Sequence, residues 1–208
     1  MKKSKRVKKT NFWKFKQNQD HFFKKSKVLG YRSRASFKLI ELNDKFKFIK
    51  KNSTLVDLGA YPGGWSQVAE NIIVNGKILA VDIKNMEPLQ NTQFLNCDIL
   101  NPNLHEKILS YFDGKLDVVI SDMAADTTGS KALDCIRTNQ LCTHALNLSL
   151  NLLKPQGVFV SKLFMGEDFI QVKNLAKSFF KYVNFFKPNA SKNESKETYL
   201  HCKILKTL

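Results

Sequence analysis

The chain has 208 residues, of which 43% are hydrophobic, and its formal net charge is +16. This length suits one well-buried domain and is too short for two large ones, and the hydrophobic content excludes a wholly disordered chain. The longest apolar stretches fall far short of the roughly 18 residues that a membrane span needs, and no short apolar block follows the basic start, so neither a membrane anchor nor a secretory signal is expected.

The first 34 residues carry most of the charge. They contain 13 Lys or Arg and one acid, Asp20, which gives +12 and leaves +4 for the other 174 residues. Aromatic residues are interleaved with these cations, at Phe12, Trp13, Phe15, Phe22 and Phe23. Cations with stacking aromatics are typical of segments that bind single-stranded nucleic acid. We therefore predict that residues 1–30 form a basic, partly flexible RNA-binding arm. The alternatives are a solvated tail or a mitochondrial presequence, although presequences are usually rich in arginine.

Beyond the arm, segments with strand and helix patterns alternate along the chain. Residues 34–48 place apolar side chains on one helical face. Strand-like runs follow at 54–58, 77–81, 93–95, 116–120, 157–163, 182–186 and 198–204, and helical patterns cover 66–73, 133–153 and 168–180. This alternation predicts an α/β fold with helices on both faces of a mostly parallel sheet. Because only the polar loop 187–196 separates the last two runs, we expect one antiparallel strand, and thus a seven-stranded Rossmann-like domain over residues 31–208.

The first strand run ends in a glycine-rich turn, in the sequence LVDLGAYPGGWS at residues 55–66. Such a turn forms the ligand crevice of an open α/β sheet, where glycines let a ligand approach the backbone and the helix start offers N–H groups to an anion. A dinucleotide site needs the spacing G-x-G-x-x-G, whereas Gly59, Gly63 and Gly64 are spaced G-x-x-x-G-G. The turn therefore favours a carboxylate-bearing cofactor such as S-adenosylmethionine over a nicotinamide; the alternative is a tight turn without a ligand.

Charged residues also end the next four strand runs. Asp82 is placed to accept hydrogen bonds from both hydroxyls of a ribose, and Asp98 to accept one from an adenine amino group. Asp122 and Lys162 follow the fourth and fifth runs. Each acid alone could be a helix cap or a turn residue, but four successive strands with charged ends point to a site. A lysine within the apolar run GVFVSKLF should be paired or functional, and its simplest partner is Asp122.

Five segments of the chain together resemble the FtsJ (RlmE) family of ribosomal RNA large-subunit 2′-O-ribose methyltransferases. They are YRSRASFKL, VDLGAYPGGWSQ, ISDMAAD, SKLFMGEDF and SKETYL, which occur in the family's order and with similar spacing between residues 20 and 206. The resemblance implies an S-adenosylmethionine-dependent methyltransferase fold. It places the family's catalytic tetrad on Lys38, Asp122, Lys162 and Glu197. Cofactor contacts are then expected at Gly59, Gly63, Trp65, Asp82, Asp98 and Asp122.

The resemblance implies methyl transfer to a ribose 2′-hydroxyl of one uridine in large-subunit ribosomal RNA, near the peptidyl-transferase centre. A 2′-O-methyltransferase of tRNA or an mRNA cap, and a non-catalytic RNA-binding assembly factor, are the alternatives. Lys162 is the candidate base, or else a charged donor that orients the hydroxyl, because a free lysine has a pKa near 10.4 and a base at neutral pH needs a lower one. RNA contacts are expected from Arg32, Arg34 and Lys38.

The cysteines and histidines carry no metal-binding pattern. Four of each are scattered along the chain without a C-x-x-C pair, so no metal site is expected and the thiols suit a reducing compartment. We expect a monomer in the bacterial cytoplasm, with an organelle as the alternative.

Two positions depart from the family pattern. Tyr61 stands where the family usually has a small residue, and Ala125-Asp126 replaces Pro-Asn.

Overall fold

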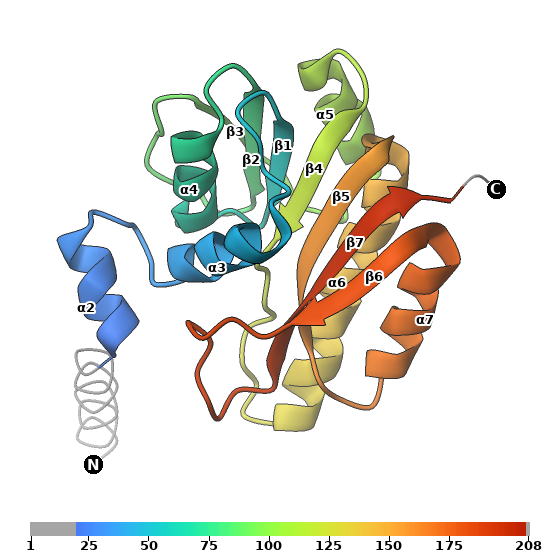
Figure 1. Cartoon of the computed structure of the whole chain (residues 1–208). Coiled ribbons are helices and arrows are strands. Elements are labelled where there is room, and N and C mark those ends of the chain that lie inside the picture. The colour runs from blue at the N-terminus through green and yellow to red at the C-terminus, as the bar shows by residue number, and fades with distance from the viewer. Residues whose placement is uncertain (1–19, 207–208) are drawn as a thin grey trace.

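Side chains along the strands point alternately to the two faces of the sheet, and a hydrophobic core forms on each face. A computed structural model describes residues 20–206 of the chain (Figure 1). The helices are α2 (His21–Val28), α3 (Ser36–Phe46), α4 (Gly64–Ile72), α5 (Leu104–Phe112), α6 (Lys131–Leu152) and α7 (Phe169–Phe179). The strands are β1 (Thr54–Leu58), β2 (Lys77–Asp82), β3 (Thr92–Asn96), β4 (Leu116–Ser121), β5 (Leu153–Phe164), β6 (Phe180–Phe186) and β7 (Glu197–Leu205).

The seven strands form one sheet in the order β3-β2-β1-β4-β5-β7-β6. Neighbouring strands from β3 to β5 pair in parallel, whereas β7 runs antiparallel to both β5 and β6. The predicted Rossmann-like sheet with a single reversed strand is therefore confirmed. β5 begins four residues earlier than the expected run at 157–163, because residues 153–156 extend the strand from the end of α6.

Helices cover both faces of the sheet, and each face buries its own set of strand residues. Val56, Val119 and Phe159 face α5, α6 and α7, whereas their neighbours in sequence, such as Val118 and Val160, face α3 and α4. Successive side chains of a strand point to opposite faces of the sheet. Because helices cover both faces, a central parallel strand must be apolar along its whole length. This explains the nearly continuous apolar runs of the central strands.

The part of the predicted basic arm that the structure describes begins with α2. The carboxylate of Asp20 caps this helix by accepting a hydrogen bond from Phe23 N at 3.1 Å, and the Phe22 ring lies 5.4 Å from that of Phe37 on α3. Residues 1–19, which hold most of the predicted arm, lie outside the described residues, so the boundary near residue 30 stays a prediction. No helix among residues 20–206 is long and apolar enough to cross a bilayer.

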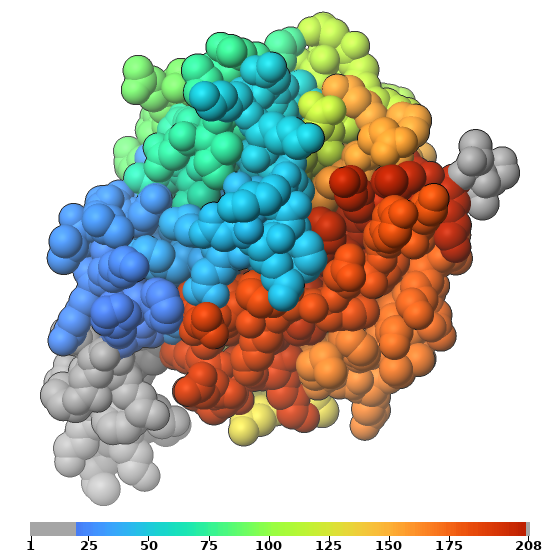
Figure 2. Space-filling view, viewed as in Figure 1, coloured from blue at the N-terminus to red at the C-terminus, as the bar shows by residue number. Residues whose placement is uncertain are grey.

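The loop between β6 and β7 lies against α3. Glu41 accepts hydrogen bonds from the backbone N–H groups of Asn189, at 2.6 Å, and Ala190, at 2.9 Å. Arg34 bridges Asp20 and the carbonyl oxygen of Ala190. In the space-filling view, the blue N-terminal part and the orange-red loop meet on one side of the molecule (Figure 2). These contacts bring the start of α3 to the carboxyl ends of the parallel strands.

Candidate active site

A cavity of about 300 Å³ opens at the carboxyl ends of β1, β2 and β4. The strand order reverses here, since β1 lies between β2 and β4, and such a reversal is where open α/β sheets bind ligands. Four of the residues that the sequence assigns to a cofactor line it, namely Gly59, Asp82, Asp98 and Asp122. The two departures from the family pattern, Tyr61 and Asp126, also contribute to its wall.

The glycine turn has the backbone geometry that the sequence predicted. Gly59 and Gly63 have φ angles of +75° and +102°, which favour glycine, and a Cβ atom on Gly59 would come within 2.0 Å of Met123 Cγ. Gly63 is the N-cap residue of α4. Trp65 lies in the first turn of this helix and is buried, with its indole N–H donating to Ala35 O at 2.9 Å. Trp65 thus joins the start of α4 to the segment that leads into α3.

The acids at the ends of β2 and β3 are held in place by backbone donors. The two Asp82 oxygens accept from Tyr61 N and Lys84 N, both at 2.8 Å. Asp98 accepts from Leu100 N at 2.9 Å. The Tyr61 side chain is 51% exposed, and Lys84 Nζ lies 5.7 Å from its ring centroid. The unusual tyrosine therefore adds a cation–aromatic contact at the rim and uses its backbone to orient Asp82.

Arg32 fastens the glycine turn to the loop after β2. Its guanidinium donates to three carbonyl oxygens: Pro62 O at 3.3 Å, Glu87 O at 2.6 Å and Pro88 O at 2.7 Å. Its backbone N–H donates to Gln67 Oε1 at 3.0 Å, on α4. Sequence reasoning assigned Arg32 to RNA alone and missed this contact, because the motif shows only an arginine next to a serine.

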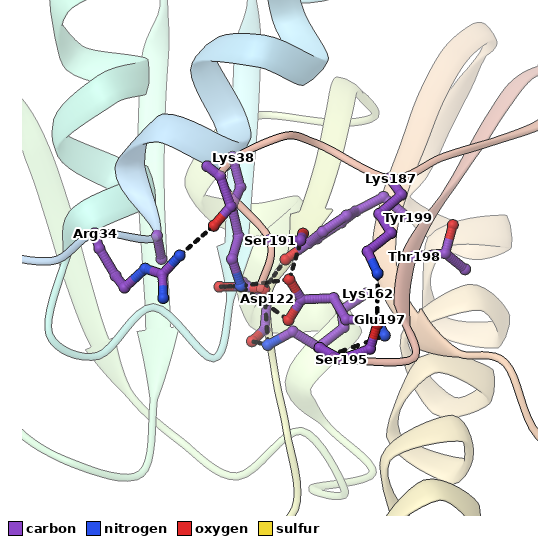
Figure 3. A network of polar contacts seen from close by, with 12 residues as sticks. Arg34, Lys38, Asp122, Lys162, Lys187, Ser191, Ser195, Glu197, Thr198 and Tyr199 are labelled. Atoms are coloured by element: carbon purple, nitrogen blue, oxygen red, sulfur yellow. Dashed lines mark hydrogen bonds and ion pairs between the residues drawn. The ribbon is translucent and has the colours of Figure 1, made fainter. Parts of the chain in front are cut away.

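The four residues of the predicted tetrad meet beside the cavity (Figure 3). Lys162 Nζ lies 2.8 Å from Asp122 Oδ1 and also donates to Asp122 O at 2.7 Å. Lys38 Nζ lies 2.8 Å from Glu197 Oε1, 2.9 Å from Glu197 Oε2 and 3.9 Å from Asp122 Oδ2. Lys38, Lys162 and Glu197 are each less than 10% exposed. The predicted pairing of Lys162 with Asp122 is present, and it is part of a larger cluster.

The sheet register explains why these residues converge. Lys162 on β5 pairs with Tyr199 on the antiparallel β7, and directly opposed residues share one face of a sheet. Tyr199 packs on the face that α3 and α4 cover, and Lys38 is a buried residue of α3. Asp122 directly follows β4, the neighbour of β5. Elements far apart in the sequence are thus brought to one point.

Two further residues complete the cluster. Tyr199 OH donates to Asp122 Oδ1 at 2.5 Å, and Ser191 Oγ donates to Glu197 Oε1 at 2.6 Å. Burial raises the pKa of the Tyr199 phenol well above its usual value, an effect that Asp122 and Glu197 reinforce, so Tyr199 remains a donor. Burial alone would raise the pKa of Asp122, but the lysine charges and the hydrogen bonds from Lys162 and Tyr199 hold it below its usual range.

Sequence reasoning missed both Tyr199 and Ser191. A signal for Tyr199 exists, because it stands two residues after Glu197 in a strand and must therefore lie on the same face. Ser191 lies in a polar loop without any periodic pattern. Among residues 20–206, no group of three or more His, Cys, Asp and Glu side chains is arranged to hold a metal ion.

Comparisons with known proteins agree with this geometry. The model of the FtsJ-like methyltransferase family matches residues 31–205. The ribosomal RNA large subunit methyltransferase E of Pelagibacter ubique is 43% identical over 194 residues, which cover 93% of this chain and 96% of that protein. The enzyme of the same name from Rickettsia akari is 44% identical over 194 residues, which cover 90% of this chain and 86% of that protein.

Solved structures of methyltransferases share the fold. A Plasmodium falciparum protein described as a ribosomal RNA methyltransferase superposes with a TM-score of 0.74 at 32% identity, covering 84% of this chain and 98% of that one. A Streptococcus mutans protein described as a methyltransferase, in complex with SAH, gives a TM-score of 0.52 at 14% identity, covering 83% of this chain and 96% of that one. At this identity, the second likeness shows the fold alone.

Asp57, at the end of β1, should make stability depend on pH. Burial raises its pKa to about 7 and outweighs the lowering by the Ser66 hydrogen bond at 2.7 Å, while Asp122 and Asp82 add smaller raising effects. The folded chain therefore keeps a proton that the unfolded chain releases near pH 4, so this stabilisation is lost as the pH rises through about 7. Through this group, the unsubstituted protein should lose on the order of 2–4 kcal/mol of its free energy of unfolding between about pH 5 and pH 8. The Asp57→Asn variant, whose side chain stays neutral, should not show this loss.

Urea unfolding of the cofactor-free protein at both pH values measures this difference. Asp44→Asn is the matched control, because Asp44 is an exposed partner of Lys47 and surface pairs contribute little. If the difference in the free energy of unfolding between Asp57→Asn and the unsubstituted protein did not change with pH, the raised pKa of Asp57 would be contradicted.

Proposed function

The chain belongs to the FtsJ-like methyltransferase family, and we propose that it transfers a methyl group from S-adenosylmethionine to a ribose 2′-hydroxyl of RNA. The acceptor we propose is a uridine of large-subunit ribosomal RNA near the peptidyl-transferase centre. The names of the relatives support large-subunit ribosomal RNA as the substrate, and the tetrad supports a ribose hydroxyl as the acceptor. The observation that carries the proposal is the buried cluster of Lys38, Asp122, Lys162 and Glu197 beside an acidic cavity.

The cavity suits a cationic adenosyl ligand. Among residues 20–206, its wall carries the carboxylates of Asp82, Asp98, Asp122 and Asp126, against one lysine, Lys84. A sulfonium group is attracted to such a wall, and the volume lies at the lower end of the range of small-molecule sites. We assign the ribose hydroxyls to Asp82, the adenine amino group to Asp98 and the methionine end to Asp122, the glycine turn with Gly59 and Gly63, and Trp65. S-adenosylmethionine supplies the methyl group on its sulfonium.

The tetrad supplies the acceptor side of the reaction. A lysine ammonium has three donors, and two of those on Lys162 are directed at Asp122, at Oδ1 and at the main-chain oxygen. As a charged ammonium, Lys162 directs its third N–H at the 2′-hydroxyl; as a neutral amine, it has its lone pair in this position and takes the hydroxyl proton onto Nζ. Asp122, fixed by Tyr199, orients Lys162 in either role. Lys38 and Glu197 hold each other and, we propose, the acceptor ribose.

We propose that RNA is positioned by the basic arm together with Arg32, Arg34 and Lys38. Residues 1–34 carry a charge of +12, which suits phosphate contacts that position a substrate without reading its bases. Both arginines also have partners within the protein, at the glycine turn for Arg32 and at Asp20 and Ala190 for Arg34. We further propose that the protein acts as a monomer in the bacterial cytoplasm.

The product identifies the reaction directly. Large ribosomal subunits from cells that lack this enzyme should accept labelled methyl groups from S-adenosylmethionine, and digestion to nucleosides should yield 2′-O-methyluridine. Transfer RNA and capped RNA serve as competing substrates in the same assay. Preferred labelling of either one, or a base-methylated product, would contradict the proposal.

Lys162→Ala should lower turnover roughly a hundredfold or more, because the group that deprotonates or orients the hydroxyl is lost. The dissociation constant for S-adenosylmethionine should change little. Lys154→Ala is the matched control, since Lys154 lies at the other end of β5 and is paired with Asp117 at the surface. Near-normal turnover of a folded Lys162→Ala variant would rule out this role.

Arg32→Ala should weaken S-adenosylmethionine binding about tenfold, because each hydrogen bond from a charged group contributes about 1.5–3 kcal/mol and three of them fix the glycine turn and the neighbouring loop. Calorimetric titration measures this affinity. Lys24→Ala, an exposed cation on α2, is the control. If Arg32 acted through RNA alone, its loss would leave cofactor affinity unchanged and lower RNA affinity.

A further inference from the structure

A groove lies next to the tetrad, between the start of α6 and the loop that joins β5 to α7. Two adjoining hollows, about 270 and 440 Å³ in volume, share Met165, Gly166, Glu167 and Lys196 in their walls. Met165 stands three residues after Lys162, and Lys196 directly precedes Glu197. The Met165 N–H donates to Lys196 O at 2.9 Å, so these two segments are joined where they leave the tetrad. The groove therefore lies close to the tetrad, at the carboxyl end of β5.

The walls of the groove are held in place by buried contacts. Asn139 on α6 donates to Phe164 O at 3.0 Å and to Asp168 Oδ1 at 2.7 Å, and it accepts from Phe164 N at 2.8 Å. The backbone of Gly166 packs against Cys135, where a Cβ atom would come within 2.3 Å of the sulfur. The loop is therefore fixed to α6, and the groove is formed before any ligand binds.

The groove combines an apolar wall with cations. Ile136, Met165 and Ile170 line it and are 37%, 49% and 56% exposed, which is unusual for large apolar side chains in three nearby positions. Of the charged residues in the described part of the chain, Lys131 and Lys196 line it, against one acid, Glu167. Apolar contact for a flat ring, with ammonium groups at the rim, matches a nucleotide whose base is buried and whose phosphate remains in solvent.

We propose that this groove binds the base of an unpaired nucleotide that flanks the methylated one. The ring contacts Ile136, Met165 and Ile170, and Lys131 and Lys196 contact the adjoining phosphates. Binding of the flanking base holds the target ribose against Lys162 and Glu197, which are close along the chain to the groove residues Met165 and Lys196. This inference rests on the proposed RNA 2′-O-methyltransferase function and adds to it a subsite for a second nucleotide.

The test replaces one apolar wall residue with a charged one. Ile136→Asp should raise the KM for large ribosomal subunits about tenfold or more, with a smaller change in kcat and an unchanged dissociation constant for S-adenosylmethionine. It should weaken binding of a short single-stranded RNA that contains the methylated nucleotide by a similar factor. Val74→Asp is the matched control, because Val74 is 69% exposed on the turn between α4 and β2, at the amino ends of the strands.

Three results of this experiment would overturn the nucleotide subsite. Equal KM values for the Ile136→Asp and Val74→Asp variants would overturn the subsite while leaving the proposed function intact. A loss with subunits but none with the short RNA would assign the groove to a ribosomal protein and overturn the nucleotide assignment. If the unsubstituted enzyme methylated no large subunits, the proposed function would fail, and the subsite with it.

Discussion

The fold depends on the pairing of buried charges at the carboxyl ends of β4 and β5. Two lysines and two carboxylates lie there largely out of solvent, and each would be expensive to bury alone. Their charges cancel, and Tyr199 and Ser191 donate to Asp122 Oδ1 and Glu197 Oε1, which the lysines also contact. Lys38 and Glu197 are 159 positions apart, so this balance exists only when α3, β4, β5 and β7 are all in place.

Residues of opposite charge lie on the two sides of this cluster, one for the methyl donor and one for the acceptor of the proposed reaction. Acids line the cavity at the ends of β1, β2 and β4, whereas lysines and arginines concentrate in α2, at the start of α3 and in the preceding arm. In the proposed reaction, a cationic methyl donor and a polyanionic acceptor approach Asp122 from surfaces of opposite charge. Asp122 belongs to both surfaces, because it lines the cavity and also binds Lys162.

The features that could be predicted from the sequence are those that depend on a local pattern of residues. Apolar runs gave the strands, the spacing of Gly59, Gly63 and Gly64 separated this turn from a dinucleotide turn, and the acids predicted after three of the strands line the cavity. Tyr199 could also have been found from its alternation with Glu197. Ser191, the contacts of Arg32 and the raised pKa of Asp57 could not, because each depends on loops or burial that only the folded chain defines.

We propose that the charged cluster directs methyl transfer to a ribose hydroxyl of large-subunit RNA. Mapping 2′-O-methyl groups across cellular RNA, with the protein present, absent or carrying Lys162→Ala, tests it most directly. We predict that one 2′-O-methyluridine of large-subunit RNA disappears in the last two strains and that other RNAs keep their modifications. An unchanged map without the protein, or the loss of a methyl group from transfer RNA alone, would contradict this account.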